Sequence, residues 1–392
     1  MASSKLRAES NSGDLPTDAL FELCRLRAVC RSWQTLTSDP LFVAAHRGFH
    51  PDPLLAVDYL IRDHGHGVEI VDLSGNVLRR IPSSEIDIFC LNDSGDVRVL
   101  LPHGQDSVIM LRTRLDVVCF TRKCHPMGLW VVNPATGVSL ALPDCHSDEV
   151  EAERTVNFGQ VESYAFGHVS STNQYKALRI TCLRPDYRQL CEVITLDGDG
   201  TSIGMWRKMQ DPPAVICSSN DMKCVAVDGV VYFVMDFNTS DLFEGVMAVE
   251  PGSIASFNLE TEEWMGTLRV PFLLAAYSLL LKLLSLADLN GCLVTAPNIY
   301  NECMDLWFLS DFESSLWVKK YSLPVQYTGF SSVYPLLVLD DGRILLTHAR
   351  GFIESYDPRT GTSANVFNMS GSGPRNVGIY TGSLLSLENP CN

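Results

Sequence analysis

Residues 130–137, WVVNPATG, place an aromatic-containing strand before an Asn turn that leads into a second strand. The same arrangement returns at residues 257–264 (FNLETEEW) and 356–361 (YDPRTG). Short apolar runs bounded by Asn, Asp, Pro and Gly are typical of antiparallel strands joined by tight turns, because these residues supply the backbone conformations that turns need. The three copies therefore predict a repeated β-hairpin.

Segments on both sides of these copies have the same character from residue 53 onward. Strand patterns flank Gly-containing turns at residues 67–82 (GVEIVDLSGNVLRRIP), 225–236 (VAVDGVVYFVMD) and 336–349 (LLVLDDGRILLTHA). The spacing is roughly 45 to 55 residues, the period of a four-stranded propeller blade. The sequence therefore predicts a mainly β protein, a kelch-like β-propeller of about six four-stranded blades, with five or seven left open. The expected blades cover residues 54–82, 86–143, 160–213, 214–271, 284–324 and 333–370.

Two details of the propeller can be predicted. Residues 54–82 supply only about three strands, so the segment 377–387 (VGIYTGSLLSL) is expected to complete the first blade and to remove two exposed sheet edges. Trp130, Trp206 and Trp264 occur at matching positions beside strands or turns. We expect these three side chains to be largely buried between blades.

The composition indicates a globular, acidic chain. Hydrophobic residues make up 46% and charged residues 19% of the 392 residues, and the formal net charge is −16 without a conspicuous Lys/Arg cluster. Because neutralising phosphates requires clustered cations, nucleic acid is not an expected partner. An acidic surface attracts basic partners, and it also serves solubility alone.

The 13 cysteines are scattered without CxxC spacing, and residues 1–14 lack the apolar core of a secretory signal. These features predict reduced thiols and a cytoplasmic or nuclear location. Cys119, Cys124 and His125 come nearest to a metal site, with Cys145 and His146 more distant. Buried structural thiols explain this distribution more simply, so neither a metal nor a cofactor is expected.

The apolar run at residues 270–287 (VPFLLAAYSLLLKLLSLA) is long enough to suggest a membrane helix. Pro271 lies near its start and Lys282 inside it, and a central Lys costs about 2.5 to 3.5 kcal/mol on membrane-insertion scales. The run also continues directly into a strand-and-turn pattern. We therefore expect a loop leading into a buried strand and no membrane span.

The N-terminal region differs from the rest of the chain. Residues 1–14 are polar and predict a disordered tail. Residues 16–37 carry apolar side chains at spacings of three and four, which predicts an amphipathic helix that Pro16 begins and residues 38–40 end. This helix either binds a partner or packs onto its own propeller.

Two sets of motifs carry a resemblance to a known family. Leu15-Pro16, Leu20-Phe21, residues 24–33 (CRLRAVCRSW) and 38–42 (SDPLF) look like the two ends of an F-box. The remainder resembles the F-box-associated propeller region of the large plant family of F-box proteins, through segments such as YAFGHVSSTNQYKALRI, CEVITLDGDG and LADLNGCLV. The resemblance covers residues 15 to about 388. It divides the chain into a tail at 1–14, an F-box-like helical segment at 15–49 and a propeller at 50–392.

The resemblance implies that the chain is the substrate-recognition subunit of a Skp–cullin–F-box ubiquitin ligase. The F-box would bind a Skp-type adaptor, and the propeller would hold a protein substrate of unknown identity. Each apolar side chain buried in an adaptor groove would contribute about 1.5 to 3 kcal/mol. Carried over onto this sequence, the adaptor-binding residues are Leu15, Pro16, Leu20, Phe21, Leu26, Val29 and Trp33.

The F-box departs from the family pattern at one point. Glu22 leads straight into Leu23, so that about nine residues of the connection between its first and second helices are missing, a length of the order of a helix–helix connection. The two helical pieces would then fuse, because the junction preserves the helical period. We expect adaptor binding to be weak or lost, and propeller function to be retained.

No catalytic motif of the GxSxG, GxxxxGK[ST], HExxH or GxGxxG type supports an enzyme. A propeller enzyme is nevertheless a rival hypothesis, since this fold also hosts enzymes whose residues lie on loops around the central channel. Carboxylates in such loops occur at residues 211–213, 236–244 and 298–302. A third hypothesis is a propeller interaction protein that has lost its adaptor.

Overall fold

A computed structural model describes residues 52–61, 65–82, 89–91, 97–99, 108–122, 128–135, 138–153, 161–183, 188–197, 203–217, 223–235, 253–270, 284–297, 303–324, 333–348, 351–369, 376–382 and 384. The contacts divide the chain into two units, Met1–Asp52 with Gly382–Asn392, and Pro53–Thr381. The description that follows concerns the second unit. The expected N-terminal helix and all seven expected adaptor-binding residues lie outside the described residues.

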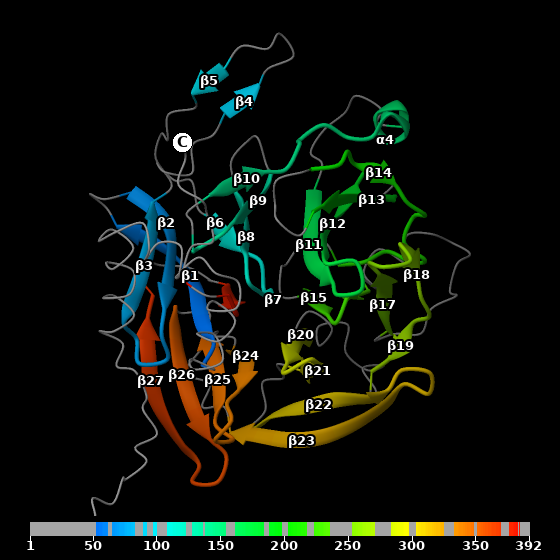
Figure 1. Ribbon diagram of the computed structural model, residues 1–392. Coiled ribbons are helices and arrows are strands. Elements are labelled where there is room, and N and C mark those ends of the chain that lie inside the picture. The colour runs from blue at the N-terminus through cyan, green and yellow to red at the C-terminus, as the bar shows by residue number, and fades with distance from the viewer. Residues whose placement is uncertain are drawn as a thin grey trace, which may run out of the picture. The chain divides into compact units, whose positions relative to one another are not determined.

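The second unit is a six-bladed β-propeller, and this confirms the expected fold class. In Figure 1 the sheets stand around a common centre, with the strands β11, β15, β20 and β24 nearest to it. The first three blades consist of the following strands. Blade 1 contains β1 (Leu54–Ile61), β2 (Gly65–Val71), β3 (Val77–Pro82) and β28 (Val377–Tyr380). Blade 2 contains β6 (Val108–Met110), β8 (Val118–Arg122), β9 (Leu129–Val132) and β10 (Ser139–Ala141). Blade 3 contains β11 (Val161–Val169), β12 (Gln174–Cys182), β13 (Gln189–Leu196) and β14 (Arg207–Lys208).

The other three blades follow the same antiparallel path from an inner to an outer strand. Blade 4 contains β15 (Cys224–Val227), β16 (Val230–Val234), β17 (Ser253–Asn258) and β18 (Glu263–Trp264), and β19 (Leu268–Arg269) also pairs with β17. Blade 5 contains β20 (Leu284–Leu289), β21 (Cys292–Pro297), β22 (Cys303–Asp311) and β23 (Leu316–Pro324). Blade 6 contains β24 (Val333–Val338), β25 (Ile344–His348), β26 (Phe352–Asp357) and β27 (Thr362–Asn368).

The C-terminal strand closes the ring as the sequence predicted. β28 is the innermost strand of blade 1 and pairs antiparallel with β1, with Leu54 opposite Tyr380 and Val57 opposite Val377. Its other edge pairs in parallel with β7 (Arg114–Leu115), which follows the inner strand of blade 2. All four residues of β28 are buried. Blade 1 therefore combines strands from both ends of the unit.

The expected extent of the second blade was wrong. The blade was expected to begin at residue 86, but its first strand is β6, at residue 108. The segment before it forms a separate two-stranded sheet of β4 (Phe89–Leu91) and β5 (Val97–Val99). A hairpin inside a blade and a free hairpin have the same local pattern, so the turn residues do not reveal which sheet a hairpin joins. A short helix, α4 (Asp148–Glu153), was also missed.

The core consists of apolar clusters between successive blades. One cluster joins Leu129 and Val131 of blade 2 to Phe166 and Ala177 of blade 3. Similar clusters lie between blades 3 and 4, 4 and 5, 5 and 6, and 6 and 1. Because the inner strands of a blade pack against neighbouring blades on both faces, successive residues are buried, whereas outer strands such as β23 and β27 are largely exposed. The last eight residues of β12 are all buried, and the run at Leu284–Leu289 is the buried strand β20.

Tryptophan indoles link successive blades. Trp130 and Trp206 are 5% and 4% exposed, as expected, whereas Trp264 is only half-buried and packs against Phe257. The Trp206 indole N–H donates to the Pro143 carbonyl at 2.7 Å, just after the outer strand of blade 2. Corresponding bonds join Trp264 to the Gln210 carbonyl at 2.8 Å and Trp317 to the Arg269 carbonyl at 2.7 Å. Each of these indoles thus fastens its blade to the outer part of the preceding one.

Candidate interaction surface

Tight turns gather on one face of the propeller. In a blade whose four strands run antiparallel in order, the turn from the first to the second strand and the turn from the third to the fourth lie at the same end. Asp228-Gly229 and Asn290-Gly291 form two of the first kind, and all four residues have positive φ. Most of the longer connections, on the opposite face, lie outside the described residues. The face that carries the turns is therefore the one whose side chains the structure describes more fully.

The repeated Asn or Asp of the sequence motif organises the turn between the third and fourth strands. Asn133 accepts a hydrogen bond from the backbone N–H of Ala135, and Asn258 accepts one from Glu260, at 2.8 and 2.7 Å. Asp357 accepts one from Arg359 at 2.9 Å. Asp72, which the sequence motif had not included, accepts the same bond from the N–H of Ser74, and Asp311 accepts one from Ser314, three residues on. An Asx side chain that mimics a backbone turn explains why these residue types recur.

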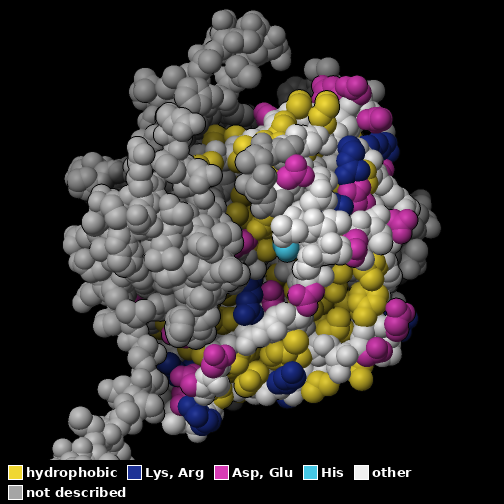
Figure 2. Space-filling view, viewed as in Figure 1, with side chains coloured by type: hydrophobic (Ala, Val, Ile, Leu, Met, Phe, Trp, Pro, Cys, Tyr) yellow, Lys and Arg dark blue, Asp and Glu magenta, His cyan; other side chains and the backbone are white. Residues whose placement is uncertain are grey.

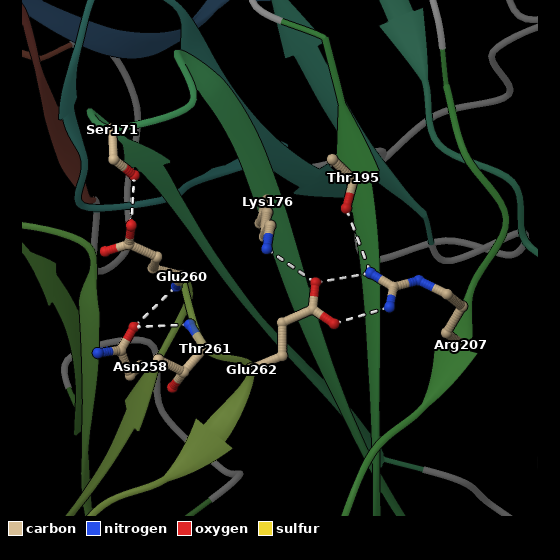
Figure 3. A network of polar contacts seen from close by, with 8 residues as sticks. All are labelled: Ser171, Lys176, Thr195, Arg207, Asn258, Glu260, Thr261 and Glu262. Carbon is tan, nitrogen blue, oxygen red and sulfur yellow. Dashed lines mark hydrogen bonds and ion pairs between the residues drawn. The ribbon is translucent and has the colours of Figure 1, made fainter.

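A charged network on this face joins blades 3 and 4 (Figure 3). Glu262, in the turn before β18, has a φ of 59° and a side chain 17% exposed. It accepts hydrogen bonds from both terminal nitrogens of Arg207, at 2.7 and 2.6 Å, and from Lys176 Nζ at 2.8 Å. Beside it, Ser171 Oγ donates to Glu260 Oε1 at 2.5 Å. The bidentate pair and the lysine fix the position of the turn.

The network stabilises the Glu262 carboxylate in its charged form. Burial opposes the ionisation of Glu262, but the hydrogen bonds from Arg207 and Lys176 outweigh it and lower the pKa of the carboxyl group. The hydrogen bond to Glu262 also raises the pKa of Arg207. A carboxylate held in its charged form by two cations is unsuited to proton transfer at neutral pH. The network therefore acts as a brace that presents a fixed polar surface.

A second ionic cluster is buried in blade 3. Arg179 of β12 and Glu192 of β13 lie opposite each other in the sheet, and both side chains are fully buried. Arg179 donates to Glu192 at 2.8 Å and stacks over the Trp206 ring, 4.1 Å from its centroid. His146 Nδ1 lies 2.7 Å from Glu192 Oε2, and the Ser147 N–H donates to Oε1 at 2.7 Å. The cluster ties the connection that follows blade 2 onto blade 3.

The surface of the described part is mixed in character. Figure 2 shows acidic and basic side chains scattered over the visible face, and hydrophobic side chains gathered over β22 and β23. Leu316 and Val318 of β23 are 53% and 44% exposed, and the Lys320 ammonium lies 4.4 Å from the centroid of the Phe308 ring. Exposed apolar groups of this number are ordinary on a protein surface.

The sequence also raised a metal site, an enzyme and a membrane span as alternatives. No group of three or more His, Cys, Asp or Glu side chains that could hold a metal ion occurs in the part of the chain that is described. Of the suspected ligands, Cys119 is buried and Cys145 exposed, and both are free thiols. Of the three carboxylate-bearing loops considered for an enzyme, only residues 211–213 are described. No described helix is long and apolar enough to cross a membrane.

We expect Glu192→Gln to lower the free energy of unfolding by about 3 to 5 kcal/mol at pH 7, because it leaves the buried Arg179 without its carboxylate. Although burial opposes its ionisation, the contacts with His146, Arg179 and Ser147 lower the pKa of Glu192 from 4.5 to about 2. A depressed carboxyl pKa contributes stability that is complete above about pH 4.5 and is lost as the pH falls toward 2. Urea unfolding of parent and variant between pH 7 and pH 4 measures the difference.

Glu262→Gln is the matched control, since it removes the same charge from a more exposed ion pair. Its cost should be about 1 kcal/mol or less. The difference between the parent and Glu192→Gln should stay constant down to about pH 4.5 and shrink below it. Equal losses in the two variants would contradict the assignment of Glu192 as a buried, structurally required carboxylate.

The chain is similar to known proteins over most of its length. Residues 95–366 match the family described as "F-box associated beta propeller domain". The F-box/kelch-repeat protein At3g23880 of Arabidopsis thaliana is 21% identical over 372 residues, which cover 93% of this chain and 91% of the relative. The F-box protein At3g07870 of the same plant is 22% identical over 388 residues, 87% of this chain and 82% of the relative.

Likenesses to solved structures are distant. The SapL1 lectin in complex with alpha methyl fucoside has 8% identity and a TM-score of 0.37, covering 81% of this chain and 96% of that one. The uncharacterized protein lmo1340 from Listeria monocytogenes EGD-e has 10% identity and a TM-score of 0.35, with 82% and 81% covered. Scores of this size add nothing to the description of the fold.

Proposed function

We propose, because the chain belongs to the F-box associated beta propeller family, that it is the substrate-recognition subunit of a Skp–cullin–F-box ubiquitin ligase. The observation that carries the proposal is the family match over residues 95–366, together with two F-box proteins similar over most of the chain. In this role the propeller holds a protein substrate, and the N-terminal segment contacts a Skp-type adaptor. The chain itself performs no chemistry.

The described surface is consistent with such a role. Its turns are fixed by Asx hydrogen bonds and by the Glu262 network, so that side chains are presented in a constant arrangement. A preformed surface loses little conformational entropy on binding. The net charge of −16 would favour a basic region on the substrate. Adaptor contact is assigned to the apolar residues from Leu15 to Trp33.

The junction of Glu22 with Leu23 favours a second candidate, a propeller interaction protein that has lost its adaptor. In that case the propeller would still bind its partner, but the partner would not be delivered for ubiquitin transfer. The two candidates differ in what happens to the bound protein. A ligase subunit shortens the lifetime of its partner, whereas a simple binding protein leaves that lifetime unchanged.

The test is to capture proteins on the tagged full-length chain with the proteasome inhibited, and to measure their half-lives after the chain is depleted. We expect at least one captured protein to become longer-lived by several-fold, with a Skp-type adaptor recovered in small amount. A chain mutated at Leu26 and Trp33 to Ala is the control, because it should keep the partner and lose the effect on its half-life. Unchanged half-lives together with no recovered adaptor would reject the ligase role and favour the second candidate.

A further inference from the structure

Arg112 crosses the centre of the propeller. It follows β6, the inner strand of blade 2, and its Nη1 donates to the carbonyl of Leu286 in β20 at 2.8 Å. Its Nη2 donates to the carbonyl of Pro335 in β24 at 2.9 Å. These acceptors belong to the inner strands of blades 5 and 6, and in a ring of six blades the fifth lies opposite the second. The guanidinium group therefore lies where the inner strands face one another.

The positive charge of Arg112 is not neutralised by a carboxylate within the described part of the chain. Two of the five N–H donors of a guanidinium are used by the two carbonyls. The Tyr334 ring lies 6.0 Å from the guanidinium carbon, and no described Asp or Glu forms an ion pair with it. Burial lowers the pKa of Arg112 to about 10. A half-buried cation whose described hydrogen-bond partners are all neutral leaves part of its desolvation cost uncompensated.

A second cation approaches the same inner strand. Lys223, which precedes β15 and is 4% exposed, donates from Nζ to the carbonyl of Leu284 in β20. Leu284 and Leu286 are two residues apart, so their carbonyls lie about 7 Å from each other along the strand. Lys223 and Arg112 are thereby held beside each other on β20. Lys223 also makes a further interaction of its own, so beside Arg112 it contributes a nearby positive charge rather than a contact to the anion.

An acidic side chain, Asp288, lies near the other end of β20. Asp288 accepts a hydrogen bond from the Gly291 N–H at 2.7 Å, in the turn that follows the strand. Burial raises the pKa of Asp288, while the bond from Gly291 and the charge of Arg114 act against this rise. This carboxyl group is therefore engaged with the turn and with Arg114. Asp288 is thus not a partner of Arg112.

We propose that the centre of the propeller is an oxyanion-binding site, in which Arg112 contacts a carboxylate or phosphate group and Lys223 adds a second positive charge. The planar donors of a guanidinium match both groups, and hydrogen bonds to them are stronger than those to neutral carbonyls. The site follows from the arrangement of the inner strands around Arg112, and it is additional to the ligase role proposed above. Should the proposed function hold, the oxyanion is carried by an acidic or phosphorylated side chain of the bound protein.

Thermal unfolding of the full chain tests the site. Chloride is replaced by phosphate, or by acetate, at constant ionic strength, and binding to the folded state alone should raise Tm by about 4 °C. Arg112→Gln should lose this rise. Arg207→Gln should keep it, because Arg207 is already paired with Glu262. A rise with phosphate alone indicates phosphorylated side chains as the ligand, and a rise with both anions includes acidic ones. No rise with either anion, or the same rise in Arg112→Gln, overturns the proposal.

Chemical modification of the parent chain decides the matter if Arg112→Gln does not fold. Phenylglyoxal reacts with accessible arginines, and mass spectrometry follows its reaction at Arg112 and Arg207 separately. We expect saturating phosphate to slow modification of Arg112 by about tenfold and to leave Arg207 unaffected, as occupancy of the site predicts. Equal rates with and without phosphate, or no reaction of Arg112 at all, would overturn the proposal, since either result means that anions do not reach it. These tests use small anions, so their outcome is independent of whether the chain joins a ligase.

Discussion

Deletion of residues 376–392 is expected to destroy the folded propeller or to lower its Tm by more than about 10 °C. The deletion removes β28, in which Val377, Ile379 and Tyr380 are 1%, 6% and 1% exposed. Burial of a large apolar side chain contributes about 1.5 to 3 kcal/mol, so these three account for roughly 5 to 9 kcal/mol. That is comparable with the whole stability of an ordinary domain.

Loss of the strand also opens the ring. β28 lies between β1 and β7, so its removal leaves unpaired backbone groups on β1 of blade 1 and on β7, which follows the inner strand of blade 2. The N–H of Ile379 donates to the Thr113 carbonyl at 2.7 Å, and the same loop carries Arg112. Exposed strand edges are templates for pairing with other chains. Aggregation should therefore accompany the loss of stability.

Removal of residues 383–392 alone is the matched control, since it retains β28 and all of its pairing. We expect this shorter deletion to leave Tm within about 2 °C of the parent, because β28 stays paired with β1 and β7. Size-exclusion chromatography and thermal unfolding of the three chains provide the comparison. A chain without residues 376–392 that stays monomeric and as stable as the parent would show that ring closure does not depend on β28.

Most of the features that could be predicted from the sequence are local ones. The turn at Asn258 could be recognised because its side chain bonds to backbone groups only two and three residues away. Asp228-Gly229 could be recognised because both residues adopt positive φ, which few residue types tolerate. Turns of this kind set the boundaries of the strands and hence the period of the blades. The closure by β28 followed from counting strands in blade 1.

The features that were missed depend on contacts between distant residues. Arg112 is 174 residues from Leu286 and 223 from Pro335, and nothing near it in the sequence marks the centre of the ring. The pair of Arg179 and Glu192 left a weak signal, because each charged residue stands between two apolar neighbours in its strand. A charged side chain is almost never fully buried without a partner. One charged residue in each of two consecutive buried strands could therefore have predicted an ion pair between them. The site for the adaptor rests on resemblance to the F-box and stays a prediction.

The second large effect concerns adaptor binding. We expect the native chain to bind a Skp-type adaptor about a thousandfold more weakly than a chain in which the missing segment is restored. The apolar side chains at both ends of the motif, Leu20, Phe21, Leu26 and Trp33, are still encoded. What the short connection changes is their relative placement. With Glu22 joined to Leu23, one continuous helix would carry both groups about 15 Å apart along its axis, because a helix rises 1.5 Å per residue.

A groove shaped for a folded helical bundle could then engage only one of the two groups. Loss of two anchors of about 2 kcal/mol each corresponds to the thousandfold difference. The repaired chain carries about nine residues from an intact relative between Glu22 and Leu23, the order of a helix–helix connection, and calorimetry measures the adaptor affinity of both forms. A Gly/Ser insert of equal length controls for spacing alone, and should restore less affinity because a flexible linker leaves the two groups unoriented. Equal and tight binding by native and repaired chains would show that the short motif is sufficient. No binding by the repaired chain would mean that the docking residues themselves have lost their complementarity.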